Sequence, residues 1–537
     1  MLSYRKLAMR VLGHPLHTGG IDSPRPASQR AAAFILTAAM LTTLAAPAFA
    51  DIWHIENGDI TISAGESGNN VTQNNNTTYG DTNTIITNQN KDTASSHTVT
   101  IEAKDKDDKV EVTLKDVNID TSSRNKAAVS VTGEGDTNIK LDGDNALKSD
   151  IYRSGIYGSG SGSLTISGGE NDSLTAQGGS GANGISSSGS LTISGGTVTA
   201  NGDDGGRGIS SNGGVTISGG STVTANGGSG TISGGDGICS SGGVTISGGS
   251  TVTANGGNGG SLVGGDGIRS GGGLTVSDGT VTAKGGNGDS KDGYGGDGIR
   301  SGGVVTISGN TVNAAGGYGG KVGGYGICSF DRVAISGGTV EAAGGNGSTG
   351  GGSGIYSSVI DLSGSLELTA KAGSPNGKAL SQKGSELVLD TIKDKLGPGA
   401  KVTATDADGK VIDQVSTPRP VEPEESSSSS DGGSAAPSAP ASPLPGLTVT
   451  DKDGQRISYT STQSGNTLTV CVGRLTASFR ISLAALRQLR AEGIETIAFQ
   501  TVLCSTTLSV DELLAMGGEN AEAVLTHRFT DSSLTVG

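Results

Sequence analysis

Three observations predict an all-β fold, in which a parallel β-helix of three-strand coils is followed by a small α+β domain. Gly-Ile pairs recur at intervals of 24 to 31 residues, so one coil contains about 28 residues. Two more short apolar stretches follow each pair, separated by glycines. Proline is absent between residues 48 and 374, as expected where every strand donates its N–H groups to the next coil. The repeated isoleucines are Ile156, Ile185, Ile209, Ile238, Ile268, Ile299, Ile327 and Ile355.

The composition excludes several other classes of protein. Glycine contributes 95 of the 537 residues, but it does not occupy every third position and the repeats lack proline, so a collagen triple helix is excluded. Disorder of the repeat region is also excluded, because isoleucine, valine and leucine recur there at regular positions. The net charge of −15 argues against nucleic acid as a partner.

Each repeat contains three segments, which read Gly-Ile-x-Ser, Gly-x-(Leu/Val)-Thr-Ile-Ser-Gly and Thr-Val-Thr-Ala-x-Gly-Gly. In stacked coils, equivalent residues lie about 4.8 Å apart, so isoleucine packs on isoleucine and valine on valine. We expect the intervening glycines to form corners with left-handed or otherwise restricted backbone conformations, which glycine adopts without a Cβ clash. A β-hairpin through Gly-Gly is the alternative. Ser221 and Ser250 lengthen this link in two units, which a coil corner absorbs more easily than a hairpin turn.

The first 50 residues have the pattern of an export signal. Basic residues precede an apolar run from Ala31 to Ala46, and small residues follow it. We therefore expect a signal peptide over residues 1–50, cleaved between Ala50 and Asp51. The run is shorter than the roughly 20 residues that a membrane-spanning helix needs. We expect a protein that is secreted or attached to the cell surface, with no integral membrane segment in the mature chain.

Changes in composition divide the rest of the chain into regions. Irregular first coils with a cap are expected at 51–154, the glycine-rich coils at 155–370, and the last coil with its cap at 371–415. Residues 416–446 are rich in Pro, Ser and Glu and are expected to be a disordered linker. Residues 447–537 contain less glycine and form the predicted α+β domain.

In the terminal domain, a helix is expected from Ser482 as N-cap to Gly493 as C-cap, with strands at 468–481 and 496–503 on either side. A second helix is expected to begin at Ser509, followed by a strand near 523–529. Cys471 and Cys504 lie on the two predicted strands, and we regard them as a possible disulfide in an oxidising compartment. Cys239 and Cys328 are three coils apart, too far for a disulfide, and should be free.

The repeat units resemble those of a known group of proteins. Residues such as Gly265-Asp-Gly-Ile-Arg-Ser-Gly-Gly-Gly-Leu-Thr-Val-Ser-Asp-Gly-Thr-Val-Thr-Ala283 are similar to the repeats of bacterial secreted carbohydrate-binding domain-containing proteins. Leu114-Lys-Asp-Val-Asn-Ile-Asp120 and Leu141-Asp-Gly-Asp-Asn-Ala-Leu147 resemble the lead-in coils of that group. The likeness covers roughly residues 95–370. It implies a pectate-lyase-like right-handed parallel β-helix in an extracellular surface protein that binds carbohydrate.

Three acidic residues at equivalent positions of successive coils are the candidate metal ligands. Asp236, Asp266 and Asp297 are expected to stack about 4.8 Å apart, where their charges repel unless they are paired or bind a cation. Calcium binding is one interpretation. The other is that Arg269 and Arg300 neutralise the carboxylates, or that each aspartate caps its own turn. No other cofactor is indicated.

Tyr294, Tyr318 and Tyr325 lie in or beside the glycine-rich loops and are the candidate ligand-binding residues. Sugar-binding sites commonly use aromatic rings, and tyrosine adds a polar tip; packing within the loops is the alternative. Threonines also flank valine in four successive coils, as in Thr197-Val-Thr199 and Thr222-Val-Thr224. They predict an exposed threonine grid that resembles the surfaces of some ice-binding β-helices, although threonine also suits any exposed strand.

Catalysis is not expected. Outside the signal the only histidines are His54, His97 and His527, none of them in the regular repeats. A polysaccharide lyase or hydrolase would need clustered metal ligands with a base, or paired catalytic carboxylates. The sequence favours a carbohydrate-binding or adhesive protein that contacts a polysaccharide or a cell-surface glycan. The main alternative is a structural spacer without a specific ligand; a polysaccharide lyase or hydrolase and an ice-binding protein are weaker ones.

Overall fold

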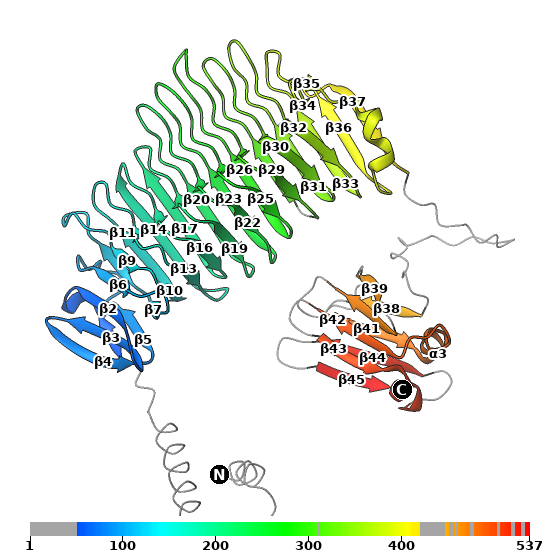
Figure 1. The fold of residues 1–537 in the computed structure, drawn as a ribbon, viewed down its shortest axis with the longest axis horizontal. Coiled ribbons are helices and arrows are strands. Elements are labelled where there is room, and N and C mark those ends of the chain that lie inside the picture. The colour runs from blue at the N-terminus through cyan, green and yellow to red at the C-terminus, as the bar shows by residue number, and fades with distance from the viewer. Residues whose placement is uncertain are drawn as a thin grey trace, which may run out of the picture. The chain divides into compact units, whose positions relative to one another are not determined.

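The computed structural model describes residues 51–418 except 310, and residues 446–536 with gaps at 451–455, 458, 465, 473–476, 502–504, 517–520 and 528–531. It contains a parallel β-solenoid of about 13 turns. The chain divides near residue 422 into two compact units, of which the solenoid is the first (Figure 1). The predicted signal peptide and most of the predicted linker lie outside the described residues.

Three parallel ladders run along the solenoid, one for each segment of the repeat. The first is formed by the Gly-Ile-x-Ser segments and their counterparts at both ends. Its strands are β2 (Ile60–Gly65), β6 (Val99–Ala103), β9 (Val129–Gly133), β12 (Ile156–Gly158), β15 (Ile185–Ser187), β18 (Ile209–Ser211), β21 (Ile238–Ser240), β24 (Ile268–Ser270), β27 (Ile299–Ser301), the first halves of β30 (Ile327–Ile335) and β32 (Ile355–Leu362), and β34 (Leu380–Gln382).

The second ladder is formed by the Thr-Ile-Ser segments. Its strands are β1 (Ile52–His54), β5 (Thr84–Thr87), β7 (Lys109–Lys115), β10 (Asp136–Asp142), β13 (Leu164–Ser167), β16 (Leu191–Ser194), β19 (Val215–Ser218), β22 (Val244–Ile246), β25 (Leu274–Val276), β28 (Val305–Ile307) and the second halves of β30 and β32.

The third ladder is formed by the Thr-Val-Thr-Ala segments and makes a separate sheet. Its strands are β8 (Asn118–Asp120), β11 (Asp144–Lys148), β14 (Ser173–Ser180), β17 (Thr197–Asp203), β20 (Thr222–Asn226), β23 (Ser250–Asn255), β26 (Gly279–Lys284), β29 (Thr311–Ala315), β31 (Gly338–Ala343), β33 (Leu366–Lys371) and β36 (Lys401–Thr405). The prediction of three strands per coil is therefore confirmed.

The core consists of stacked aliphatic side chains. Ile209 is in register with Ile238, and Ile238 with Ile268, and all three are fully buried. Serines at the ends of the regular first-ladder strands β18, β21, β24 and β27 are also buried, and their hydroxyls donate to glycine carbonyls of the preceding coil. Ser240 Oγ, for example, donates to Gly213 O at 2.8 Å. Each coil thus buries its apolar face only against its neighbours, which is the stability logic of a repeat protein.

The corner between the second and third ladders absorbs the extra serines. Gly219 and Gly220 have φ of +68° and +70°, a region that favours glycine. Ser221 is fully buried, and its hydroxyl donates to the carbonyl of Ser218. Thr222 still pairs with Thr251. The hairpin alternative is wrong, because the segments before and after the Gly-Gly link belong to different ladders.

The long glycine-rich loops have a different physical cause from the one predicted. Here the glycines have no left-handed φ; instead two limbs of backbone lie too close for side chains. Gly286 N–H donates to Gly265 O, and Gly296 N–H to Gly286 O, both at 2.8 Å. A Cβ on Gly286 would lie 1.9 Å from Gly257 O. Glycine is required at these positions by the approach of neighbouring coils, and the loops stack in order rather than projecting freely (Figure 1).

Both ends of the solenoid are capped. At the first end, β3 (Gly68–Gln73) and β4 (Asn76–Asp81) add antiparallel to β2, and a 3-10 turn, η1 (Ile55–Asn57), follows β1. At the other end, β35 (Ser385–Glu386) pairs antiparallel with β34, and β37 (Val411–Ser416) with β36, while η2 (Leu389–Lys395) buries Leu389 and Ile392. These additions cover strand edges that would otherwise pair with another chain.

The second unit is a small α+β domain with two four-stranded sheets. One contains β38 (Leu447–Thr450), β41 (Ala477–Ser482), β44 (Glu522–His527) and β45 (Ser532–Val536); the other contains β39 (Thr460–Ser464), β40 (Thr467–Cys471), β42 (Thr496–Gln500) and β43 (Ser505–Ser509). Phe479 of the first and Phe499 of the second are in ring contact, 4.8 Å between centroids.

Both predicted helices of this unit are present. Helix α3 (Leu483–Ala491) begins after Ser482, whose hydroxyl accepts the Ala485 N–H at 3.2 Å, and Gly493 follows with a φ of +92°. Helix α4 (Val510–Met516) has Asp511 and Glu512 in its first turn. Within the described part of the chain, no helix is long and apolar enough to span a membrane.

Candidate functional site

The three predicted acidic residues form a hydrogen-bonded row. Asp236, Asp266 and Asp297 immediately precede β21, β24 and β27 and are all buried. Asp236 Oδ1 accepts the Asp266 N–H at 2.9 Å, Asp266 Oδ1 accepts the Asp297 N–H at 2.7 Å, and Asp297 Oδ1 accepts the Tyr325 N–H at 2.7 Å. Each carboxylate therefore ties its coil to the next one, rather than capping its own turn.

Arginines pair with the two ends of this row. Arg207 Nε lies 3.3 Å from Asp236 Oδ2, and Arg300 Nη1 lies 3.4 Å from Asp297 Oδ2. The predicted pairing of Arg300 with Asp297 is confirmed. Arg269 is exposed, and among the described residues it forms no ion pair with Asp266. Asp266 is thus the member of the row without an arginine.

Burial and mutual repulsion change the protonation of the row. Burial raises the pKa of Asp266 to about 8, assisted by the neighbouring charges of Asp297 and Asp236. Burial also raises the pKa of Asp297 to about 6, although the Tyr325 N–H and Arg300 oppose that rise. At neutral pH, burial and the neighbouring charges therefore favour a proton on Asp266.

The calcium interpretation stays a prediction. Among the described residues, no group of three or more His, Cys, Asp or Glu side chains is arranged to hold a metal ion. One oxygen of each aspartate already accepts a backbone N–H, so a cation would have to use the remaining oxygens. Calcium takes six to eight oxygen ligands.

Two free cysteines lie beside the row. Cys239 pairs in register with Arg269, and Cys328 with Arg300. Both thiols are free, as predicted. Burial raises the pKa of Cys239 to about 11 and of Cys328 to about 12, so neither is a thiolate at neutral pH. The thiol of Cys471 lies 3.2 Å from Gln500 Oε1. Cys504 lies outside the described residues, so the possible disulfide between Cys471 and Cys504 stays a prediction.

The three predicted tyrosines do not form one site. Tyr294 and Tyr318 are on the tips of adjacent glycine-rich loops and are 42% and 48% exposed. Lys321 Nζ lies 5.6 Å from the centre of the Tyr294 ring. Tyr325 instead continues the aspartate row, and its ring stacks on that of Tyr356 at 4.9 Å. Loop-tip exposure thus distinguishes Tyr294 and Tyr318 from Tyr325, whose ring packs within the protein.

The loop tips also carry features that the sequence analysis missed. Exposed apolar side chains accompany the tyrosines: Ile232, Leu262 and Val263. Asn258 Oδ1 accepts the Asn287 N–H at 2.8 Å, and Asn287 Oδ1 accepts the Tyr318 N–H at 2.9 Å. The sequence contained a signal for this row of bonds, because asparagine recurs after Gly-Gly in several repeats. These bonds hold the tips in register with one another.

The threonine grid is present as a geometric feature. Thr197, Thr222 and Thr251 are in register, as are Thr199, Thr224 and Thr253. The valines between them are buried. The row that contains Thr199, Thr224 and Thr253 continues with Asn313 and Glu341 in later coils, so the grid ends there.

No family model, no curated protein and no solved structure matches this chain significantly. The structure confirms the parallel β-solenoid that the resemblance to secreted carbohydrate-binding repeat proteins implies. The function of this chain has to be argued from its own residues.

Proposed function

We propose that this protein is a secreted or surface-associated bacterial β-solenoid that binds carbohydrate and acts in adhesion. The observation that carries the proposal is the pair of exposed tyrosines, Tyr294 and Tyr318, on adjacent loop tips. Aromatic rings with a polar edge are suited to a ligand that has both apolar C–H faces and hydroxyl groups. Lys321 beside Tyr294 adds a hydrogen-bond donor.

The rigidity of the loops supports this role. Parallel bridges link Gly259, Gly288 and Gly319 on one limb, and Val263, Tyr294 and Val322 on the other. A binding surface that is ordered before the ligand arrives loses less conformational entropy on binding. The repetition of coils also suits a ligand that is itself a repeating polymer, because several weak contacts along one chain combine.

The proposed role is non-catalytic. The aspartates of the buried row each accept a backbone hydrogen bond, and the nearby thiols have raised pKa values. His97 lies 3.2 Å from Asp59 Oδ1 in an ion-pair cluster with Arg124, and His527 is fully buried. These are structural environments, and they give a lyase or a hydrolase no support. The threonine grid keeps ice binding as a minor candidate, tested by thermal hysteresis.

A structural spacer is the second candidate, and the capped ends favour it. Antiparallel strands close both ends of a continuous three-ladder solenoid, as a rod that only separates two other parts would require. The two candidates differ in whether the loop tips make specific contacts.

A glycan-binding screen with Tyr294→Ser and Tyr318→Ser variants separates them. We expect the purified chain to bind a defined set of polysaccharides, and we expect the double variant to lose at least about tenfold in affinity. Tyr79→Ser is the matched control, because Tyr79 is 76% exposed on β4 and remote from the loop tips. Absence of binding to any glycan would favour the spacer.

A further inference from the structure

A small pocket lies at the start of the regular coils, away from the residues discussed above. Its volume is about 230 Å³. It is formed by the loop that precedes β12, by β12 itself, by the loop that follows β14, and by β15. The lining residues are Tyr152, Arg153, Ser154, Tyr157, Gly181, Ala182, Asn183 and Ser186. The cavity is thus surrounded by two tyrosines, one guanidinium group, one side-chain amide and two serine hydroxyls.

The backbone of neighbouring coils places the two tyrosines, and both side chains are exposed, Tyr152 to 78%. Tyr157 occupies a ladder position whose partners on both sides are serines, Ser130 and Ser186, so its ring stands above small side chains and is 44% exposed. Tyr152 has a φ of +59°, which bulky residues seldom adopt. Its N–H donates to Ser180 O at 2.9 Å, and its ring covers Gly181, where a Cβ would lie 2.9 Å from the ring.

The polar groups of the pocket retain hydrogen-bonding capacity. Arg153 Nε donates to Asn125 Oδ1 at 3.1 Å, which orients the guanidinium; among the described residues, its two Nη atoms have no partner. Asn183 Oδ1 accepts the Arg207 N–H at 2.8 Å, and its Nδ2 has no partner within the described ranges. Neighbouring donors of this kind match the vicinal hydroxyls of a sugar ring.

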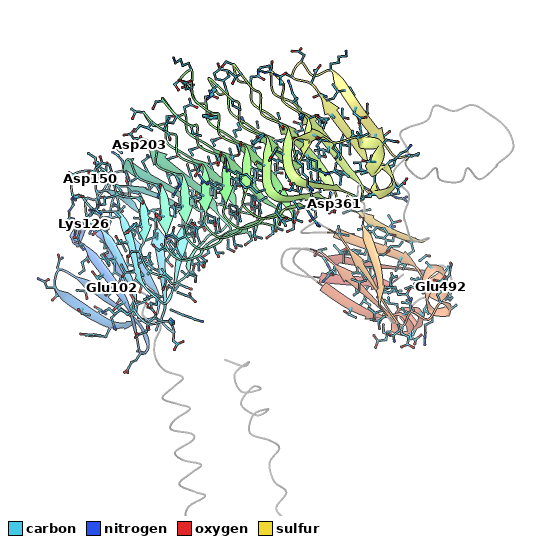
Figure 2. The ribbon with its side chains drawn as sticks, turned by 45° about the horizontal axis from the view of Figure 1, so that its top comes forward. Glu102, Lys126, Asp150, Asp203, Asp361 and Glu492 are labelled. Carbon is cyan, nitrogen blue, oxygen red and sulfur yellow. The ribbon has the colours of Figure 1, made fainter. Side chains whose placement is uncertain are left out.

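The surrounding charge favours a neutral ligand. The carboxylate of Asp150 is close to Arg153 in sequence and accepts the N–H groups of Asn125 and Ile151 at 2.6 and 2.7 Å. Two more acidic residues, Asp203 and Asp204, lie in the next coil. The Asp203 carbonyl oxygen accepts the Gly181 N–H at 3.0 Å. Asp204 Oδ2 accepts the Ser180 hydroxyl at 3.2 Å. Asp150 and Asp203 lie along the same edge of the solenoid (Figure 2). The chain as a whole carries a net charge of −15, so a polyanion would be repelled.

The size of the pocket limits what it can hold. Its volume is below the range of about 300–1,000 Å³ that is usual for drug-sized ligands, and it corresponds to roughly eight water molecules. One sugar ring matches this space, and the rest of a polymer would extend outward over the adjacent coils. From Gly227 onward the loops become the tall stacked loops of Figure 1, so the pocket occupies the part of the ladder that precedes them.

We propose that this pocket binds one hexopyranose unit of a neutral polysaccharide, with the sugar ring against Tyr152 and Tyr157 and its hydroxyls bonded to Arg153 and Asn183. This site rests on the proposed carbohydrate-binding function, and it adds a binding locus separate from Tyr294 and Tyr318. The site is an open, mainly polar pocket of about the size of one sugar ring, with two tyrosines and several hydrogen-bond donors at its edge, and this suits a ligand whose surface consists mostly of hydroxyl groups.

The test is isothermal titration of the full chain with neutral and uronic-acid oligosaccharides, repeated on Tyr157→Ser. Serine is native at the flanking ladder positions, so this variant should fold, and circular dichroism checks that it does. We expect neutral oligosaccharides to bind and Tyr157→Ser to weaken binding at least about tenfold, equivalent to about 1.4 kcal/mol. Tyr152→Asn, which tolerates a left-handed φ, should weaken it as well. Tyr79→Ser should leave binding unchanged.

Three outcomes would contradict the proposal, and they identify what failed. If Tyr294→Ser or Tyr318→Ser abolishes binding while Tyr157→Ser and Tyr152→Asn do not, the pocket is not the site, but the carbohydrate-binding function stands. If only uronic-acid oligosaccharides bind through the pocket, the assignment of a neutral sugar is wrong. If no oligosaccharide binds the full chain, the pocket and the proposed function both fail.

Discussion

Replacing Asp266 by asparagine should stabilise the protein at neutral pH. Asp266 lies between Asp236 and Asp297, is buried, and has no paired arginine among the described residues. Asparagine preserves the acceptor oxygen, and the chain already uses asparagine for the same bond between coils, from Asn287 N–H to Asn258 Oδ1 at 2.8 Å. The substitution thus keeps the link between coils and removes the need to protonate a buried carboxyl group when the chain folds at neutral pH.

The magnitude follows from the pKa of Asp266. The pKa of Asp266 is 3.8 in the unfolded chain and about 8 in the folded protein, so the folded state holds the proton more tightly. Between these two pH values the folded state binds more protons than the unfolded state, so the free energy of unfolding falls as pH rises. At pH 7 the difference of roughly three pH units corresponds to at most about 4 kcal/mol. Because the pKa of the neighbouring Asp297 is raised as well, protons are shared between the two carboxyl groups, and we expect a gain of about 2 to 4 kcal/mol.

Thermal unfolding followed by circular dichroism measures this effect. For a solenoid of this size, the gain corresponds to a rise in Tm of roughly 3–5 °C at pH 7. The rise should be larger at pH 8 and should vanish below about pH 3, where Asp266 is protonated in both states. Asp278→Asn is the control, since Asp278 is exposed in the same coil and should shift Tm by less than about 1 °C. A gain that is equal at pH 4 and pH 8, or a loss at every pH, would refute the reasoning.

Three further predictions concern glycine packing, calcium and cysteine. Gly286→Ala should lower the free energy of unfolding by several kcal/mol, because its Cβ would lie 1.9 Å from Gly257 O. Gly350→Ala is the control, since its Cβ would lie 3.8 Å from the Val322 side chain, and it should change the free energy of unfolding by less than about 1 kcal/mol in urea titrations. Because arginines pair with both ends of the aspartate row, adding EDTA at pH 7 should leave Tm unchanged. A fall in Tm of several degrees that Ca²⁺ reverses would show that the row binds calcium and would contradict this expectation. Non-reducing mass spectrometry should find Cys239 and Cys328 alkylated as free thiols, and a bridge between them would contradict the coil spacing.

The sequence predicted the repeat architecture because a single signal recurs many times. Ile209, Ile238 and Ile268 could be aligned from the Gly-Ile pairs alone, and the same alignment placed Asp236, Asp266 and Asp297 in one row. Helix α3 was equally accessible, since Ser482 and Gly493 are strong helix boundaries.

The remaining features depend on contacts that have no local signal. Strands β3 and β4 come from an asparagine-rich stretch with few apolar residues, and only their place beside β2 makes them strands. The glycines of the corners have the left-handed φ that was predicted, whereas those of the tall loops are required by the approach of other coils, which the sequence does not reveal. The pocket at Tyr152 and Tyr157 unites residues from two coils whose positions in the repeat are not equivalent.

A quantitative glycan-binding measurement that also analyses the products tests the central claim most directly. The purified chain is incubated with an array of neutral and acidic polysaccharides, and both bound glycan and released oligosaccharide are determined. We predict specific, saturable binding with no change in polysaccharide length. Shortening of a polysaccharide would contradict the non-catalytic role, and absence of binding to every glycan would contradict the carbohydrate-binding role in favour of a structural spacer.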